Sequence, residues 1–164
     1  MKPHAILSRS AVSLALLGAA LPSAAATVDV TLTADNAYAL YTGTYANISA
    51  YHGFAENPSA SDIASPETYT FTMSSGDSIY VVAYSDDFVA QGLLAEFDVD
   101  GTVLTTGSSR WEVAATGIDL DPGDTPPTLA ELTAQVQLAN AGSVPSGGWV
   151  DQDWGRRLHV PEQG

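Results

Sequence analysis

The stretch Ser78-Ile-Tyr-Val-Val-Ala-Tyr-Ser85 decides how we interpret the fold of this chain. Successive side chains of a β-strand point to opposite sides of the sheet. On one side of this stretch the side chains would be those of Ile79, Val81 and Ala83. On the other side they would be those of Tyr80, Val82 and Tyr84. Because both sets are apolar, the pattern predicts a central strand that is covered on both of its faces.

Two further strand-like runs, Glu67–Met73 and Gly92–Val99, flank this stretch. The first run reaches it through the short connection Ser74–Asp77, which is typical of an antiparallel hairpin. We therefore expect the three runs to pair as a meander with residues 78–85 in the middle. In both flanking runs polar and apolar residues alternate, which is the pattern of a strand with one face toward water.

Other short strands are expected outside this unit. They are residues 27–34, 38–44 and 48–54 before it, and residues 102–106 and 110–116 after it. The dipeptide Asp100-Gly101 is the strongest hairpin signal in the chain. In the last run, alternation would place Trp111, Val113 and Ala115 inward. About eight short strands predict an all-β, mainly antiparallel fold, a single β-sandwich or jelly-roll-like domain.

One helix is predicted over residues 128–140, at the C-terminal end of the domain. Thr128 and Glu131 have the spacing of a capping box, in which each side chain accepts from the other residue's backbone N–H. An apolar stripe follows at helical spacing, formed by Leu129, Leu132, Val136 and Ala139. We expect this helix to pack on one face or open end of the sheets.

Residues 1–26 are interpreted as a cleavable secretory signal. A basic leader with Lys2 and Arg9 precedes an apolar run at residues 11–21, which ends in the small-residue exit Ala24-Ala25-Ala26. The run is shorter than the about 20 residues of a membrane span. We place the cut after Ala26 and expect no membrane insertion after it. The protein would then be secreted, in the extracellular space or at the cell surface, with the periplasm as the alternative.

The remaining chain reads as one domain over residues 27–141 and an irregular tail over residues 142–164. It is strongly acidic. The whole chain has 19 Asp and Glu residues against five Lys and Arg, a net charge of −14. Removing residues 1–26 takes away two of the five basic residues, so the net charge becomes −16. Such a surface repels phosphate backbones and anionic membranes, which argues against nucleic acid as a partner.

Several segments of the sequence, in their order along the chain, resemble those of one kind of exported protein. They are Thr31-Leu-Thr-Ala-Asp-Asn36, Pro66-Glu-Thr-Tyr69, Tyr80-Val-Val-Ala-Tyr-Ser-Asp-Asp87, Gln91-Gly-Leu-Leu-Ala-Glu-Phe97 and Trp111-Glu-Val113. This order resembles secreted bacterial β-sandwich proteins of the PEP-CTERM-exported type. The ending Val160-Pro-Glu-Gln-Gly164 matches only the start of their sorting signal, without the apolar span and arginine cluster. The resemblance implies an extracellular or surface-matrix protein with no assigned enzymatic activity.

An acidic loop is the candidate metal site. Asp119, Asp121 and Asp124 place three carboxylates close together, and Ca²⁺ takes about six to eight oxygen ligands of this type. The alternative is that these aspartates cap their own turn and that the protein has no cofactor.

Aromatic residues are the candidate carbohydrate site, because flat rings offer stacking surfaces. The set is Tyr38, Tyr41, Tyr45, Tyr51, Trp149 and Trp154. We single out Tyr41, Tyr45, Trp149 and Trp154 and expect them to be exposed together if the protein binds a surface polysaccharide. The alternative is that the strand tyrosines fill the core.

Catalysis has the least support in the sequence. The sequence contains no catalytic serine elbow, zinc-protease helix or phosphate-binding loop. Glu96 and Glu112 would have to converge to act as a glycosidase pair.

We therefore interpret the protein as a non-catalytic surface or matrix protein. The alternatives are a carbohydrate-binding module and then a secreted glycoside hydrolase. Exposed strand edges would also allow self-association.

Overall fold

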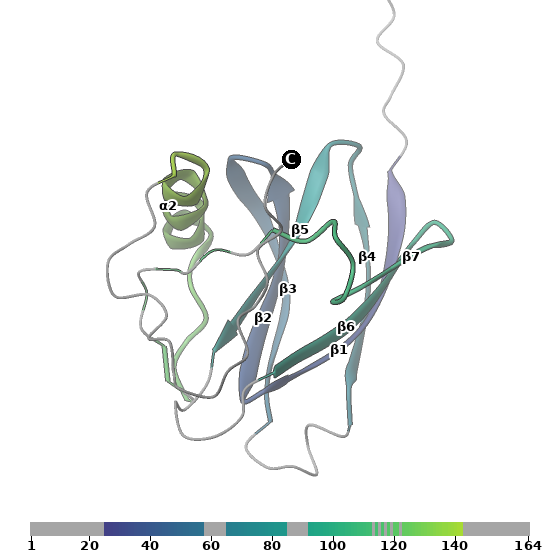
Figure 1. Ribbon diagram of the computed structural model, residues 1–164, viewed down its shortest axis with the longest axis horizontal. Coiled ribbons are helices and arrows are strands. Elements are labelled where there is room, and N and C mark those ends of the chain that lie inside the picture. Colours follow the sequence, from purple (N-terminus) through teal and green to yellow (C-terminus); the bar gives the residue numbers. More distant parts are fainter. Residues whose placement is uncertain are drawn as a thin grey trace, which may run out of the picture.

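The computed structural model describes residues 25–57, 65–84, 92–112, 114, 116, 118, 120, 121 and 123–142. These residues form seven strands and one helix (Figure 1). The elements are β1 (Ala26–Asp35), β2 (Ala37–Thr44), β3 (Asn47–Glu56), β4 (Glu67–Met73), β5 (Asp77–Tyr84), β6 (Gly92–Val99), β7 (Thr102–Thr105) and α2 (Leu129–Asn140).

Two antiparallel sheets pack face to face, and α2 lies on the outer side of one of them (Figure 1). The four-stranded sheet has the order β4-β1-β6-β7, and the three-stranded sheet has the order β3-β2-β5. All strand pairs are antiparallel. The predicted all-β sandwich with one packing helix is therefore confirmed.

The predicted meander around residues 78–85 is wrong. β5 pairs only with β2 among the described strands, whereas β4 and β6 both pair with β1 in the other sheet. The physical reason is the polarity of the strand faces. β4 and β6 each have one polar face, which must meet water, and the four-stranded sheet provides that face. β5 is apolar on both sides and belongs in the middle layer, where both faces are covered.

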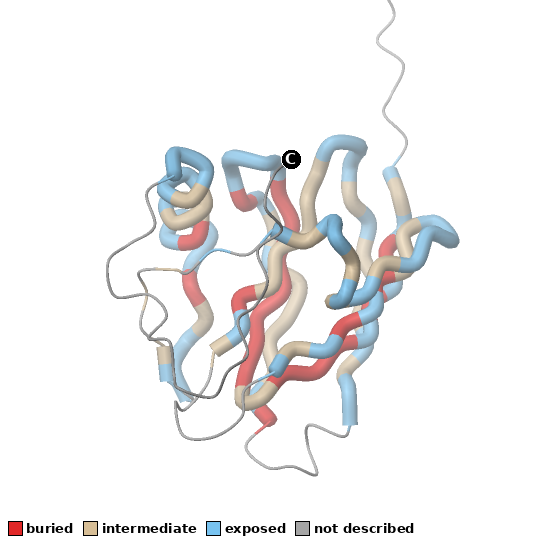
Figure 2. The backbone as a smooth tube through the Cα atoms, viewed as in Figure 1, coloured by how far each residue is buried: buried red, intermediate tan, exposed pale blue. Residues whose placement is uncertain are grey.

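The three-stranded sheet is the middle layer, between the four-stranded sheet and α2, and its central strand β2 is buried on both faces, as Figure 2 shows. Every residue of β2 from Ala37 to Gly43 is buried. On the sandwich side, Tyr38 and Leu40 pack with β1 and β6, together with Ile79 and Val81 of β5. On the helix side, the buried set is Ala39, Tyr41, Ile48, Val82 and Leu132, with Tyr80 and Tyr84 packed against it. For residues 78–84 the prediction of packing on both faces is confirmed, although Ala83 is exposed. The predicted central position is wrong, because β5 is an edge strand of the order β3-β2-β5 and β2 is the central strand.

Two local sequence signals produce the expected structures. Asp100 and Gly101 both have positive φ, 48° and 83°, as a tight hairpin turn between β6 and β7 requires. Thr128 and Glu131 form the capping box at the start of α2. The side chains of Gln137 and Asn140 donate to the carbonyls of the β2–β3 turn, at 3.1 and 2.6 Å, and hold the helix against the middle layer.

The predicted strand at residues 110–116 is wrong, because its described residues are not in a strand. Trp111 instead turns its ring into the sandwich core against Phe97, with ring centroids 5.2 Å apart. Its Nε1 donates to the carbonyl of Thr105 at 2.8 Å. Burial of this one large ring replaces strand pairing as the force that fixes the segment.

Asn57 holds the corner where the chain passes from β1 in one sheet to β2 in the other. It is 2% exposed. Its Nδ2 donates to the hydroxyl of Thr33 at 3.3 Å and to the carbonyl of Ala34 at 3.1 Å. Its backbone N donates to the carbonyl of Asn36. Asn57 therefore bonds to the last residues of β1 and to Asn36, the residue between β1 and β2.

We predict that Asn57→Ala lowers the free energy of unfolding by about 1–3 kcal/mol, because it removes two buried hydrogen bonds, to the Thr33 hydroxyl and the Ala34 carbonyl. Denaturant unfolding of the variant measures this change. Asn47→Ala is the matched control, since Asn47 is exposed in β3 and should change stability by less than about 0.5 kcal/mol. Equal effects of the two substitutions would contradict this role for Asn57.

Candidate functional site

The tyrosines singled out from the sequence lie in different environments. Tyr41 is fully buried, and its hydroxyl donates to the carbonyl of Pro127 at 2.7 Å. Burial raises the pKa of this hydroxyl. Tyr45 is 60% exposed in the β2–β3 turn. Trp149 and Trp154 lie outside the described residues. Tyr41 therefore belongs to the core, and Tyr45 remains accessible to a ligand.

A groove of about 400 Å³ lies between β2, β3 and the segment that leads into α2. Its lining consists of Tyr41, Tyr51, Thr125, Pro126, Pro127, Thr128 and Leu129. Tyr51 contributes the most accessible large ring of this set, at 51% exposed, and Leu129 is 36% exposed. None of these described lining residues carries a charge at neutral pH. The groove therefore offers an apolar surface with hydroxyl groups at its edge.

The groove forms because the helix begins beside the ring of Tyr51. Tyr51 pairs with Tyr41 across β2 and β3, and their ring centroids are 5.3 Å apart. Burial raises the pKa of the Tyr51 hydroxyl, so it stays neutral and can donate a hydrogen bond. Pro126 and Pro127 also line the groove, and the buried Pro127 is held in place by the hydrogen bond from the Tyr41 hydroxyl to its carbonyl.

The carboxylate of Glu131, two residues beyond the lining residue Leu129, serves the helix cap. It accepts from the backbone N and the hydroxyl of Thr128, at 2.8 and 2.7 Å. These hydrogen bonds lower the pKa of the Glu131 carboxyl. The negative charge of Glu131 is thus held at the helix N-terminus, where it also interacts favourably with the helix dipole.

The candidate calcium loop is only partly described, because Asp119 lies outside the described residues. Asp121 and Asp124 are exposed and form one turn. The carboxylate of Asp124 accepts from the backbone N of Asp121 at 2.9 Å, and its own N donates to the Asp121 carbonyl at 3.0 Å. Glu56 accepts from the backbone N of Gly123. Within the described part of the chain, no three acidic or histidine side chains are grouped as metal ligands.

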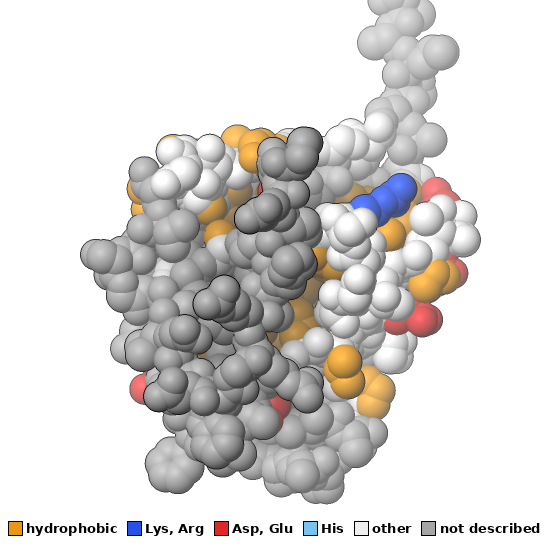
Figure 3. Space-filling model, viewed as in Figure 1, with side chains coloured by type: hydrophobic (Ala, Val, Ile, Leu, Met, Phe, Trp, Pro, Cys, Tyr) orange, Lys and Arg blue, Asp and Glu red, His pale blue; other side chains and the backbone are white. Residues whose placement is uncertain are grey.

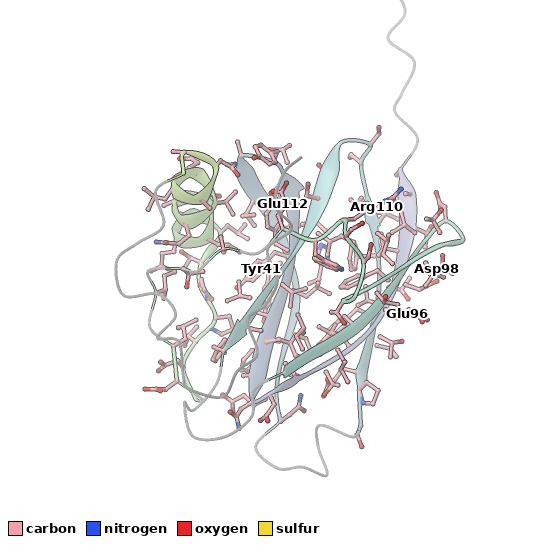
Figure 4. The ribbon with its side chains drawn as sticks, in the orientation of Figure 1. Tyr41, Glu96, Asp98, Arg110 and Glu112 are labelled. Atoms are coloured by element: carbon pink, nitrogen blue, oxygen red, sulfur yellow. The ribbon has the colours of Figure 1, made fainter. Side chains whose placement is uncertain are left out.

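Glu96 and Glu112 do not converge. Figure 4 shows them on separate parts of the molecule, Glu96 along β6 and Glu112 in the segment that follows β7. Alternation turns Glu96 away from the sandwich core, whereas Glu112 is exposed and close enough to Tyr80 to influence its hydroxyl. These two carboxylates therefore do not form the pair that a glycosidase needs.

His52 occupies the side of the sandwich where β3 meets β4. Its ring stacks on that of Phe71, with centroids 3.9 Å apart, and its Nε2 lies 2.8 Å from the hydroxyl of Thr42. Burial lowers the pKa of His52 below its ordinary value of 6.5. The neutral imidazole thus acts as a packing residue between the two sheets.

Comparison with protein-family models, with curated proteins and with solved structures gives no match for this chain. Among the described residues, no helix is long and apolar enough to cross a membrane. The function of the site is therefore argued from its own geometry. The groove could not be predicted from the sequence, because β2, β3 and the start of α2 are brought together only by packing. The paired prolines before the capping box were its only local signal.

The pKa of His52 predicts that stability falls on acidification. The unfolded state takes up a proton as the pH falls through about 6.5, while the folded state resists protonation, so unfolding becomes more favourable. Above this pH the contribution is fully present. Urea unfolding between pH 7.5 and pH 5.5 should show the loss, and His52→Gln should flatten it. If His52→Gln lost stability as steeply on acidification, His52 would not be the cause of the loss. His159→Gln is the comparison variant and should keep the pH dependence of the wild type.

The sequence-based calcium site predicts that millimolar Ca²⁺ raises the thermal unfolding midpoint and that Mg²⁺ does not match the effect. A ligand at a hundred times its dissociation constant stabilises the folded state by roughly 2.7 kcal/mol. Asp121→Asn should abolish the rise, whereas Asp29→Asn, on β1 in the other sheet, should retain it. An unchanged midpoint with Ca²⁺ would leave the aspartates as turn caps only.

Proposed function

We propose that this protein is a non-catalytic, exported domain of the bacterial cell surface or extracellular matrix. In this proposal it binds a neutral sugar ring of a surface polysaccharide in the groove beside Tyr51. The observation that carries the proposal is the half-exposed ring of Tyr51 in a groove whose other accessible lining residues, among them Pro126 and Leu129, carry no charge.

The shape and chemistry of the groove suit a sugar ring. A pyranose has an apolar face of C–H groups and an edge of hydroxyls, and an aromatic side chain with a polar tip complements both. Tyr51 offers a flat face for the first, and its own hydroxyl and that of the exposed Thr125 can serve the second. Ligand sites generally combine an apolar lining with a small number of polar groups in this way.

Charge favours a neutral sugar over an acidic one. The chain is strongly acidic, and Glu131 holds a negative charge at the helix start that adjoins the groove. An anionic polysaccharide would be repelled by this field, and the repulsion would weaken with added salt. In the view of Figure 3, the only basic group of the described residues, Arg110, lies on the opposite side of the molecule from α2.

The binding test uses the exported protein and neutral gluco-oligosaccharides, followed by calorimetry or by NMR shift changes. Tyr51→Ala should weaken binding by about tenfold, because it removes the stacking ring and its buried area. Tyr51→Phe should retain most of the affinity, since it keeps the ring.

Tyr45→Ala is the matched control. Tyr45 is more exposed than Tyr51 but does not line the groove, so its removal should leave affinity unchanged. Loss of binding in Tyr45→Ala but not in Tyr51→Ala would move the site to the β2–β3 turn. Absence of binding to neutral sugars at millimolar concentration would contradict the proposal.

A further inference from the structure

The start of β1 and the β6–β7 turn are joined by two reciprocal hydrogen bonds. The backbone N of Thr27 donates to the carboxylate of Asp100 at 3.0 Å. The backbone N of Asp100 donates back to the carbonyl of Thr27 at 3.1 Å. The turn that presents Asp100 is itself fixed, because Gly101 N donates to the Asp98 carboxylate at 2.6 Å. The carboxylate of Asp100 is therefore held at one backbone nitrogen.

That nitrogen is the one that cleavage after Ala26 would release. In the uncleaved chain it is a neutral amide with one hydrogen to donate. Hydrolysis of the Ala26–Thr27 peptide bond consumes one water, leaves a carboxylate on Ala26 and makes the Thr27 nitrogen a primary amine. The α-amino group of a protein has an ordinary pKa of about 7.7–8.0, so it is mostly an ammonium near neutral pH.

We propose that removal of the leader creates an ion pair between the α-ammonium of Thr27 and the carboxylate of Asp100, which latches β1 to the β6–β7 hairpin in the mature protein. The proposal rests on the export of the protein, and it adds a role for processing in the stability of the fold. It requires no movement of the turn, because donor and acceptor are already within hydrogen-bond distance.

The latch matters because of the place of β1 in the fold. β1 is an inner strand of the four-stranded sheet and pairs with both β4 and β6. Its first buried residue, Val28, comes directly after Thr27, is 0% exposed, and pairs with Phe71 on one side and Val99 on the other. A new chain end at Thr27 would leave this strand prone to fraying. An ion pair at the end opposes that fraying.

The surrounding charges favour the ammonium. Asp29 on β1 and Asp98 on β6 lie directly opposite each other in the register, two positions from Thr27 and Asp100 respectively. Thr72, the β4 partner of Thr27, is uncharged. Arg110 is the one basic group of the described residues, and Figures 3 and 4 show it toward the same end of β1 in projection. Two neighbouring carboxylates beside Asp100 outweigh this single cation, so we expect the pKa of the amino group above its ordinary value.

The test begins with the full chain, which is exported by a bacterial host and purified. Mass spectrometry of the product must give Thr27 as the first residue. NMR titration of the amino group should then show a pKa higher by about half a unit in the wild type than in Asp100→Asn. Asn keeps the turn preference and a side-chain oxygen acceptor but removes the charge. Asp29→Asn is the control for the general acidic field and should change the pKa less.

Stability gives a second, independent measurement. Because the folded-state pKa is raised, the latch stabilises the protein fully below the unfolded-state pKa and loses its effect as pH rises through the folded-state value. The difference in unfolding midpoint between wild type and Asp100→Asn should therefore shrink between pH 7 and pH 9.5. In uncleaved protein this difference should not depend on pH over that range.

The outcomes separate the latch from the proposed function. A product that begins at Thr27 but has the same amino pKa in native, urea-unfolded and Asp100→Asn protein would overturn the latch and leave export intact. A product that begins elsewhere would overturn the cleavage position and the latch with it. Neither result affects sugar binding at Tyr51, which is measured separately. The native-against-unfolded comparison in the wild type keeps the test valid if Asp100→Asn does not fold.

Discussion

The fold depends on a middle layer that must be apolar on both faces. The three-stranded sheet lies between the four-stranded sheet and α2, so no residue of β2 from Ala37 to Gly43 reaches water. Each large polar group placed there needs a partner inside the protein. Tyr41 meets this need with the Pro127 carbonyl, and Tyr38 donates to Glu67 at 2.9 Å and lies 2.9 Å from the Tyr69 hydroxyl. These bonds orient the layers while the apolar area holds them together.

The two open sides of the sandwich are closed by different means. Between β3 and β4, His52 stacks on Phe71, and Gly53 leaves the space that the ring of Tyr69 occupies. At the side of β7, the ring of Trp111 packs against Phe97 in the core, and its Nε1 donates a hydrogen bond to the carbonyl of Thr105 at the end of β7. Rings rather than strand pairing therefore seal both sides. A sandwich closed in this way keeps its two sheets separate and leaves the polar face of the four-stranded sheet in water.

The groove beside Tyr51 is a consequence of how the helix reaches the middle layer. Pro126 and Pro127 bring the chain in as an extended segment, and the capping box starts α2 directly after them. The hydrogen bond from the Tyr41 hydroxyl to the Pro127 carbonyl holds this segment in place beside the ring of Tyr51. The same bond that anchors the helix thus shapes the candidate binding surface. An apolar wall of this kind, without charges of its own, is distinct from the acidic character of the rest of the chain.

The sequence by itself determined seven strands, their polarity and the local signals, and it was wrong about an eighth strand at residues 110–116. Alternation located β1 through β7 within a residue or two, the Asp100-Gly101 turn and the Thr128 capping box were correct, and two-sided apolarity placed β5 in a covered layer. Only the tertiary structure decided which strands pair and which aromatic rings stay exposed. Strand pairing depends on which faces of all the strands must reach water in the complete sandwich. For this reason β4 pairs with β1 and not with β5, which follows it in the sequence. The tertiary structure also decided the exposure of Tyr41 and Tyr51, which are neighbours across β2 and β3: Tyr41 packs with Leu132 of α2 in the core, whereas the ring of Tyr51 stays half-exposed.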